Sequence, residues 1–430
     1  MNCNFLLLVQ EIARHEDLME LLIEIDHSWE PVQKTSISDL LQALADQNEL
    51  FQKCLDKSEK AAEKDEEKLS TIISETHAAV QEALKKQKFH KQKDDITEIL
   101  KLPLSDIFFK LIRPLRLETI DMSQNGSYSN HYNHGEVASK MAVSQAKMFR
   151  LAQEIADLSS SLPCDPTNSI FVRVDKKHVD LLKIIILGSS GTPYAHGAFE
   201  FDMFCDDTYP QNPPKCTLKT TGGQQVRFNP NLYHNGKVCL SLLGTWRGSA
   251  SENWDPKIST ILQVLISIQA IIMSTEVYFN EPGYEHEANT PEGEKKNQGY
   301  SNVVRYCNVK FAIIEQIKKP PAGFESVILR SMYLKREVIL KEVEEWVSAA
   351  DQEASYNGLV GEHNAAWCKQ FKEAGKYKEM MVKVYAELQE VFNAMDSPFL
   401  DESGKILSLS IKIGEQKAAA QKDAKGQGVA

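Results

Sequence analysis

Four short β-rich runs, separated by turn-forming clusters, constrain the fold of this chain more than any other feature of its sequence. The runs are SIFVRV, LLKIIILG, AFEFDMFC and KCTLKT, at residues 169–174, 181–188, 198–205 and 215–220. β-Branched and aromatic residues favour strands, and the third run alternates apolar and polar residues as a half-buried strand does. The four runs predict an antiparallel four-stranded meander with one face in solvent.

Helical patterns flank these strands. Apolar residues recur at helical spacing over residues 138–162, where Pro163 ends the pattern, so one amphipathic helix is predicted there. The most apolar run, residues 258–273, is too short to span a membrane and predicts a buried helix. Further helical patterns cover residues 301–393. This order of elements predicts the α+β class.

The chain has 430 residues, which exceeds one compact core and predicts several domains. We expect a helical N-terminal region (1–122), a linker rich in Ser, Asn and Gly (123–137), a core (138–313), a helical extension (314–395) and a disordered tail (396–430). In the first region, the spacing over residues 36–102 predicts a helical hairpin or short coiled coil. Its charged face could bind a partner or only meet solvent.

Composition and charge narrow the class of function. A formal net charge of −11 argues against a sequence-independent nucleic-acid binder and favours protein partners. The apolar stretch at residues 5–9 is shorter than a signal-peptide core. The eight cysteines show neither a CxxC pair nor a Cys/His cluster at zinc spacing. We therefore expect an intracellular, cytoplasmic protein with reduced thiols, no metal and no membrane span; a nuclear location stays open.

A lone cysteine, Cys239, follows two turns in the segment RFNPNLYHNGKVCLSLL (residues 227–243). Pro230 and Gly236 prevent a continuous ladder there and favour partial exposure, which a reacting thiol requires. A buried structural thiol is the alternative. His234 has no obvious orienting acid, and we expect it to be an exposed turn residue rather than a catalytic base.

A thiol that only accepts an acyl group from another thioester needs little activation. Attack of an amine on the new thioester then passes through an oxyanion, to which a rigid side-chain amide could donate a hydrogen bond. Asn231, fixed by Pro230, is the candidate donor. Its amide could instead only close the turn, and both roles can hold together.

The chain from residue 143 to residue 311 resembles the core of a ubiquitin-conjugating enzyme. The resemblance rests on the run TPYAHGAFEFDMFCDDTYPQNPPKCTL, the run VRFNPNLYHNGKVCLSLL, the tripeptide at 254–256 and the helix LQVLISIQAII, in that order. The family's Tyr-Pro-x-x-Pro-Pro, His-Pro-Asn and acceptor cysteine match Tyr209-Pro210-x-x-Pro213-Pro214, Asn229-Pro230-Asn231 and Cys239.

Within the family, the chain most resembles the C-terminal conjugating domain of the giant BRUCE (Apollon) type, a hybrid of conjugating enzyme and ligase connected with apoptosis regulation. Three features carry this: NPN in place of HPN, the long loop GTWRGSASENW (244–254), and YFNEPGYE (278–285) followed by a helical extension. The giant members also carry an inhibitor-of-apoptosis zinc repeat, and residues 1–135 lack its Cys/His spacing.

The resemblance implies that Cys239 accepts ubiquitin as a thioester from the activating enzyme and passes it to substrate lysines, while Asn231 stabilises the oxyanion. It implies no cofactor, because the activating enzyme uses the ATP. The first helix, with Lys140, Lys147 and Arg150, would face the activating enzyme, or these charges form only a solvated face. A ubiquitin-like modifier, self-ligase activity, and ligase binding or self-association through the flanking helices stay open.

The chain departs from the family pattern at several positions. Asn229 replaces a histidine and is expected to be a turn residue, Ser241 replaces an acid, and Gln211 replaces a residue that docks ligases. Glu281 or Asn280 lies near the family's acidic gate residue, and neither is assigned that role.

Three aromatic residues of the extension could anchor an interface or belong to a core: Trp346, Trp367 and Tyr377. Two functional alternatives remain at this point. One is an inactive variant of the conjugating fold that binds ubiquitin or scaffolds a complex. The other is a helical interaction protein whose central domain is only a platform.

Overall fold

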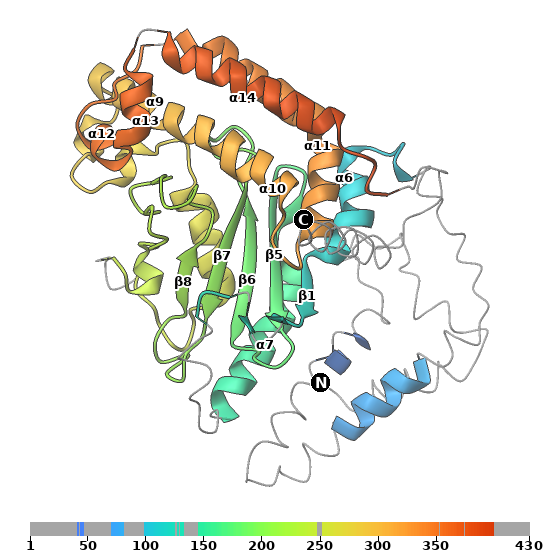
Figure 1. Ribbon diagram of the computed structural model, residues 1–430. Helices are drawn as coiled ribbons and strands as arrows, with labels where there is room; N and C mark the ends of the chain where they lie inside the picture. The colour runs from blue at the N-terminus through green and yellow to red at the C-terminus, as the bar shows by residue number, and fades with distance from the viewer. Residues whose placement is uncertain are drawn as a thin grey trace, which may run out of the picture.

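A central sheet, flanked by helices, organises the chain in the computed structural model (Figure 1). The structure describes residues 41–42, 44–46, 70–80, 99–124, 127–128, 130–132, 145–246, 252–351, 353–373 and 375–399. Within these residues, no helix has both the length and the hydropathy that a membrane-spanning helix needs.

The predicted four-stranded meander forms as expected. Its strands β5 (Asn168–Asp175), β6 (Leu181–Leu187), β7 (Ala198–Phe204) and β8 (Lys215–Leu218) pair antiparallel in sequence order. Two further strands lie beside β5: β1 (Leu117–Ile120) is parallel to it and β4 (Cys164–Asp165) is antiparallel. The sheet is therefore mixed. Strands β2 (Ser123–Gln124) and β3 (Ser127–Tyr128) form a separate pair.

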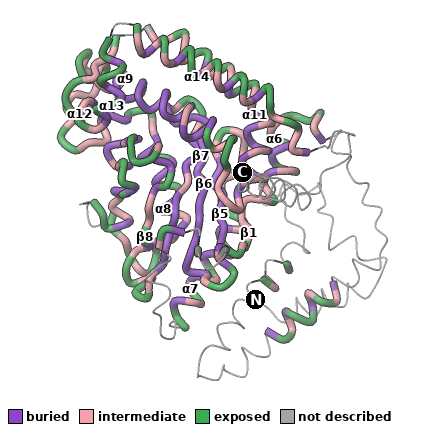
Figure 2. Tube along the Cα trace, in the orientation of Figure 1, coloured by how far each residue is buried: buried purple, intermediate pink, exposed green. Residues whose placement is uncertain are grey.

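The prediction that one face of the meander meets solvent is wrong, although the polar residues of the strands do share one face. The register places Arg173, Lys183 and Asp202 side by side on neighbouring strands. These side chains pair with one another and with their neighbours: Lys183 Nζ lies 3.0 Å from Asp202 Oδ1, and Arg173 Nη2 lies 2.8 Å from Glu118 Oε2. All three residues are at most 2% exposed, and Figure 2 shows β5, β6 and β7 buried over most of their length.

Residues 130–132 lie against this face. Asn130 Nδ2 donates to Leu182 O at 2.9 Å, and the His131 amide donates to Asp202 Oδ2 at 2.7 Å. The ring of Tyr132 stacks on Phe204, with centroids 6.0 Å apart. These residues, which we expected in a polar linker, satisfy the buried groups of the sheet. Residues 133–137 of that expected linker lie outside the described residues, and the domain boundaries stay a prediction.

Two helices contribute buried apolar residues to the same core as the strands. Helix α7 (Gln145–Ser161) lies within the range 138–162 predicted for the first helix, whose residues before 145 are outside the described ones. The predicted apolar helix is α8 (Ile261–Ser267), continued by the π-helical segment η5 (Ile268–Ile272). Thr260 begins it with a capping box, in which the Thr260 hydroxyl accepts from Gln263 N and the Gln263 side chain accepts from Thr260 N.

The predicted C-terminal helices form a layer across one end of the sheet, where α11 and α14 run side by side (Figure 1). The helical elements from residue 291 onward are α9 (Pro291–Cys307), η8 (Asn308–Ile314), α10 (Glu315–Lys318), α11 (Glu325–Ser348), η9 (Ala349–Asp351), α12 (Leu359–His363), α13 (Ala365–Phe371) and α14 (Lys376–Asn393). Short helical elements earlier in the chain are α6 (Leu104–Ile107), η2 (Phe108–Ile112), η3 (Arg113–Leu115), η4 (Ser241–Leu243), η6 (Tyr278–Asn280) and η7 (Glu285–Glu287).

This layer shares one hydrophobic core with the sheet. Trp367 and Tyr377 are buried members of the same cluster as the strands, so for these two the core alternative is correct. Trp346 is only half-buried, with the Arg305 guanidinium 5.8 Å from its ring. Phe399, within the predicted disordered tail, is buried against Tyr333. The rest of that tail, from residue 400, lies outside the described residues.

Little of the predicted N-terminal hairpin belongs to the described residues. Residues 41–42, 44–46 and 70–80 are helical, as expected. Gln42 Oε1 lies 2.9 Å from His77 Nε2, so these two helical stretches touch. Whether they continue as a coiled coil depends on residues outside the described ranges.

Candidate active site

The turns around Cys239 bring the Asn-Pro-Asn motif against the cysteine. Single β-bridges pair Asn229 with Leu232 and Leu232 with Val238, and the Cys239 amide donates to Asn231 O at 2.9 Å. Gly236 makes this hairpin close: it has φ 91°, and a Cβ there would lie 2.6 Å from Leu218 O. Residues eight apart in sequence thus become backbone neighbours.

Cys239 is buried at 3% exposure, so the expectation of partial exposure is wrong. The turn residues alone did not reveal that the chain after Cys239 folds back on itself. The Thr245 hydroxyl accepts from Leu240 N at 2.9 Å and donates to Val238 O at 2.7 Å. His234, five residues before the cysteine, is exposed in its turn, as expected. The middle of the long loop, residues 247–251, is outside the described ranges.

Asn229 holds the turn from inside the protein. Its Nδ2 donates to Tyr194 Oη at 3.0 Å and to Ile272 O at 2.8 Å, while its Oδ1 accepts from Asn231 N at 2.9 Å. The residue is completely buried, and a side-chain amide does not act as an acid or a base at neutral pH. These contacts agree with the expectation of a turn residue rather than a base.

The side chain of Asn231 is half-buried and has one long hydrogen bond among the described residues, from Nδ2 to Asn280 O at 3.5 Å. Asn280 in turn donates through its Nδ2 to Ile272 O at 3.1 Å. The turn fixes the Asn231 backbone, and the long contact leaves its amide able to donate elsewhere. The geometry therefore makes Asn231 a backbone neighbour of the cysteine and does not by itself define the role of its side chain.

Arg227 is a residue of this site that sequence reasoning missed. Its Nη2 donates to Pro230 O at 2.6 Å, and its guanidinium lies over the Tyr233 ring, 3.8 Å from the centroid. The same Nη2 lies 3.7 Å from Glu281 Oε2. Burial raises the pKa of the Glu281 carboxyl, and Arg227 partly offsets that shift. The only signal in the sequence was an arginine two residues before the Asn-Pro-Asn motif.

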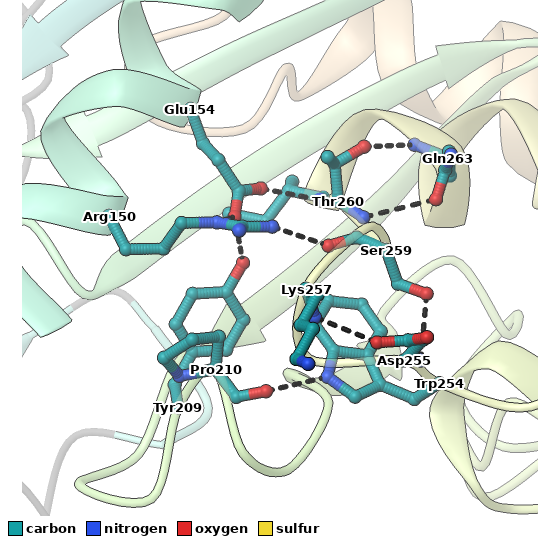
Figure 3. A network of polar contacts seen from close by, with 11 residues as sticks. Arg150, Glu154, Tyr209, Pro210, Trp254, Asp255, Lys257, Ser259, Thr260 and Gln263 are labelled. Carbon is teal, nitrogen blue, oxygen red and sulfur yellow. Dashed lines mark hydrogen bonds and ion pairs between the residues drawn. The ribbon is translucent and has the colours of Figure 1, made fainter.

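A second polar network ties the Tyr209-Pro210 motif to both helices of the core (Figure 3). The buried carboxylate of Glu154 on α7 accepts from the Tyr209 hydroxyl, from Arg150 Nε at 2.5 Å and from the Ile261 amide at 2.7 Å, at the first residue of α8. Trp254 Nε1 donates to Pro210 O at 2.7 Å. This network holds the Tyr-Pro turn against α7 and the start of α8.

Of the two described charges that we expected on the surface of the first helix, Lys147 lies inside the protein and Arg150 is half-buried. Lys147 is 1% exposed, and its Nζ lies 2.8 Å from Asp180 Oδ2. Arg150 is paired with Glu154, and its Nη2 donates to Ser259 O at 2.6 Å. Neither is a simple solvated charge, and Lys140 lies outside the described residues. Of the other departures, Gln211 is exposed and Ser241 is half-buried.

No group of three or more His, Cys, Asp or Glu side chains gathers at metal-binding distance within the part of the chain that the structure describes.

Comparison with known proteins finds a matching family model and several relatives, all described as ubiquitin-conjugating enzymes. The family model described as ubiquitin-conjugating enzyme matches residues 150–308. The human dual E2 ubiquitin-conjugating enzyme/E3 ubiquitin-protein ligase BIRC6 is 40% identical over 290 residues, which is 65% of this chain and 6% of that protein. The probable ubiquitin-conjugating enzyme protein 17 of Caenorhabditis elegans is 40% identical over 60% of this chain and 34% of its own length. The putative ubiquitin-conjugating enzyme E2 38 of Arabidopsis thaliana is 36% identical over 61% of this chain and 79% of its own length.

Proposed function

Because this chain belongs to the ubiquitin-conjugating enzyme family, we propose that it carries ubiquitin as a thioester on Cys239 and transfers it to lysine side chains of protein substrates. The observation that carries the proposal is the backbone hydrogen bond from Cys239 N to Asn231 O at 2.9 Å, which makes the cysteine a neighbour of the residue whose side chain is the proposed donor. The chain spans only 6% of the human relative and 34% of the nematode one, so the activity of such longer proteins enters here only as part of the proposal.

The first proposed step loads Cys239. The Cys239 thiol gives up its proton to solvent, and the resulting thiolate attacks the carbonyl carbon of the thioester that joins ubiquitin to the activating enzyme. A carbon–sulfur bond to Cys239 Sγ forms, the bond to the activating enzyme's sulfur breaks, and that sulfur takes up a proton. One thioester replaces another, so the step needs no base of its own, in keeping with the exposed position of His234. ATP is consumed earlier by the activating enzyme, and we propose no cofactor for this chain.

The second step is discharge. A neutral lysine amine attacks the thioester on Cys239 and forms a tetrahedral oxyanion. Asn231 Nδ2 donates a hydrogen bond to that oxyanion, which lowers the barrier by about 3–4 kcal/mol, as a single donor does in other acyl-transfer enzymes. The carbon–sulfur bond then breaks, Cys239 leaves as a thiolate, and the amine loses a proton to solvent as the isopeptide bond forms.

The setting and partners follow from the same chemistry. All six cysteines among the described residues are free thiols, which supports an intracellular, reducing compartment. Ubiquitin, its activating enzyme and lysine-bearing proteins are the partners that the two steps require. The exposed Gln211, where the family pattern has a residue that docks ligases, supports the further proposal that the chain acts as its own ligase.

Loading is tested by incubating the full chain with ubiquitin, its activating enzyme and ATP. We expect an adduct that a thiol reagent cleaves, that persists in Cys216→Ala and that is absent from Cys239→Ala. Cys216 is the matched control because it is a free thiol on β8 of the same domain. If the wild-type chain binds ubiquitin without forming the adduct, the inactive variant of the fold is the correct alternative.

Discharge is tested on the loaded chain with free lysine as acceptor. We expect Asn231→Ala to load normally and to discharge several hundredfold more slowly (about 200- to 900-fold), since the loss of about 3–4 kcal/mol of oxyanion stabilisation slows the rate by that factor. Loss of both steps in equal measure would show that Asn231 only maintains the turn.

A further inference from the structure

We propose that the C-terminal helical extension is part of the active site and that Asn364 is a positioning residue for ubiquitin transfer. Asn364 acts through Arg227, which it fixes beside the Asn-Pro-Asn turn and Glu281. This inference rests on the proposed function for its activity readout, and it extends that function by giving the extension a task in the discharge step.

The contact between Asn364 and Arg227 is a complete amide-to-backbone pair. The Arg227 amide donates to Asn364 Oδ1 at 3.0 Å, and Asn364 Nδ2 donates to Arg227 O at 3.1 Å. Asn364 is 2% exposed and lies 137 residues from Arg227 along the chain. Its side chain thus replaces the neighbouring strand that the backbone at residue 227 would otherwise need.

The local structure of the extension explains why Asn364 can do this. It lies between α12 and α13, with φ −134° and ψ 46°, at the position where an asparagine ordinarily caps the following helix. No such cap forms, because the side chain points instead to Arg227. One helical turn later, Trp367 is buried and its Nε1 donates to Gln225 O at 3.3 Å. Asn364 and Trp367, at the start of α13, therefore hold residues 225–227 through hydrogen bonds at two positions.

Arg227 connects the extension to the Asn-Pro-Asn turn beside Cys239. Its backbone is held by the extension, and its side chain donates to Pro230 O between the two asparagines of the motif. A shift of residue 227 would move the turn that presents Asn231, and with it the donor that the oxyanion needs. Misplacement by about 1 Å costs catalysis about a hundredfold in other enzymes.

The residue before Asn364 reaches the same place from another side. His363 Nε2 lies 3.9 Å from Glu281 Oε2, and His363 Nδ1 lies 3.1 Å from Tyr300 Oη. Tyr300 Oη also lies 3.1 Å from Arg227 O, where it donates. Burial and the nearby Arg227 charge lower the pKa of His363 to about 3, so the imidazole is neutral at cellular pH and does not compete with Arg227 for Glu281.

The experiment compares loading and discharge of the full chain in single-turnover form, with free lysine as the acceptor at several concentrations. For Asn364→Ala we expect normal loading and a maximal discharge rate lowered by about tenfold or more. The milder Asn364→Asp keeps the acceptor for the Arg227 amide and loses the donor to Arg227 O. It should fall between the wild type and Asn364→Ala, and it serves if the alanine variant fails to fold.

Asn302→Ala is the matched control. Asn302 is also 2% exposed, and its Nδ2 donates to Tyr356 Oη at 2.9 Å, joining α9 to the extension without touching Arg227. We expect this variant to lower the melting temperature and leave the discharge rate unchanged. The inference would be overturned if Asn364→Ala discharged ubiquitin at the wild-type rate, or if Asn302→Ala slowed discharge as much as Asn364→Ala does.

A second measurement separates failure of this inference from failure of the proposed function. Hydrogen–deuterium exchange of residues 227–239 needs no ubiquitin, and we expect Asn364→Ala to increase it and Asn302→Ala to leave it unchanged. If the wild-type chain forms no thioester, the proposed function fails, while exchange still decides whether Asn364 holds the turn. Unchanged exchange in Asn364→Ala would refute the positioning role.

Discussion

At the scale of single residues, the site depends on amides held by other amides. Asn229 is buried and uses both ends of its side chain to hold the turn, and Asn364 does the same to the backbone of Arg227. The motif pointed to Asn229, Asn231 and Cys239 in advance, because their spacing is local. It said nothing of Asn364, since a contact across 137 residues leaves no periodic or local trace in one sequence.

The half-buried His363 makes the free energy of unfolding depend on pH. Its pKa is lowered from 6.5 to about 3 in the folded chain, chiefly by burial and then by Arg227. The unfolded chain therefore binds the proton more readily, so the stabilisation is fully present above about pH 6.5 and is lost as the pH falls toward 3. The loss is less than about 1.4 kcal/mol per pH unit, because water screens part of the charge.

His363→Gln removes this titration. Melting temperatures measured from about pH 7 to about pH 5 should fall more steeply for the wild type than for this variant. The buried His196, whose pKa is also lowered by burial, contributes equally to both curves. Parallel curves would contradict the prediction.

At the scale of elements, the helices and strands were predicted correctly from their patterns. Which of their faces meet solvent was predicted wrongly. The period of two in the third strand correctly separated an apolar face from a polar one. Whether that polar face met water depended on residues 130–132, which lie across it and pair with its buried groups. In the same way, helix α7 was predicted correctly, but its Lys147 was expected in solvent and is buried.

The Lys147–Asp180 pair tests this correction. Lys147→Ala leaves the Asp180 carboxylate, at 6% side-chain exposure, without its partner on α7, and should lower the free energy of unfolding by about 3–5 kcal/mol. Urea unfolding followed by tryptophan fluorescence measures this. The double variant Lys147→Met, Asp180→Leu should regain much of the loss, because apolar residues replace a buried pair at little cost. A surface role for Lys147 would instead leave unfolding unchanged.

At the scale of the whole molecule, the extension and the sheet share one core, and the conjugating family's range is not a separable unit within it. Tyr306 and Phe311 lie inside the range of the predicted core and pack their rings against Trp367 in the extension, at centroid distances of 5.4 and 5.9 Å. At the opposite edge, β1 adds a parallel strand beside β5, from residues that we had assigned to the N-terminal region.

A fragment of residues 138–313, the predicted core alone, should therefore be unstable. Loss of the extension uncovers the rings of Tyr306 and Phe311, and loss of β1 removes Glu118 from the buried Arg173. We expect this fragment to bind a hydrophobic dye and to melt at a lower temperature than a fragment of residues 99–399, or to aggregate. Equal melting temperatures for the two fragments would show that the core folds by itself.

The sequence by itself determined the α+β class, the four-stranded meander and the segment with Cys239 and its asparagine turn, because strand period, capping residues and motif spacing act over a few residues. Tertiary structure decided the rest. The burial of Cys239, the covered polar face of the sheet and the pairing of Asn364 with Arg227 all depend on which distant segment lies against which surface. Long-range packing selects those neighbours through the whole core at once, and no local pattern in the chain encodes that choice.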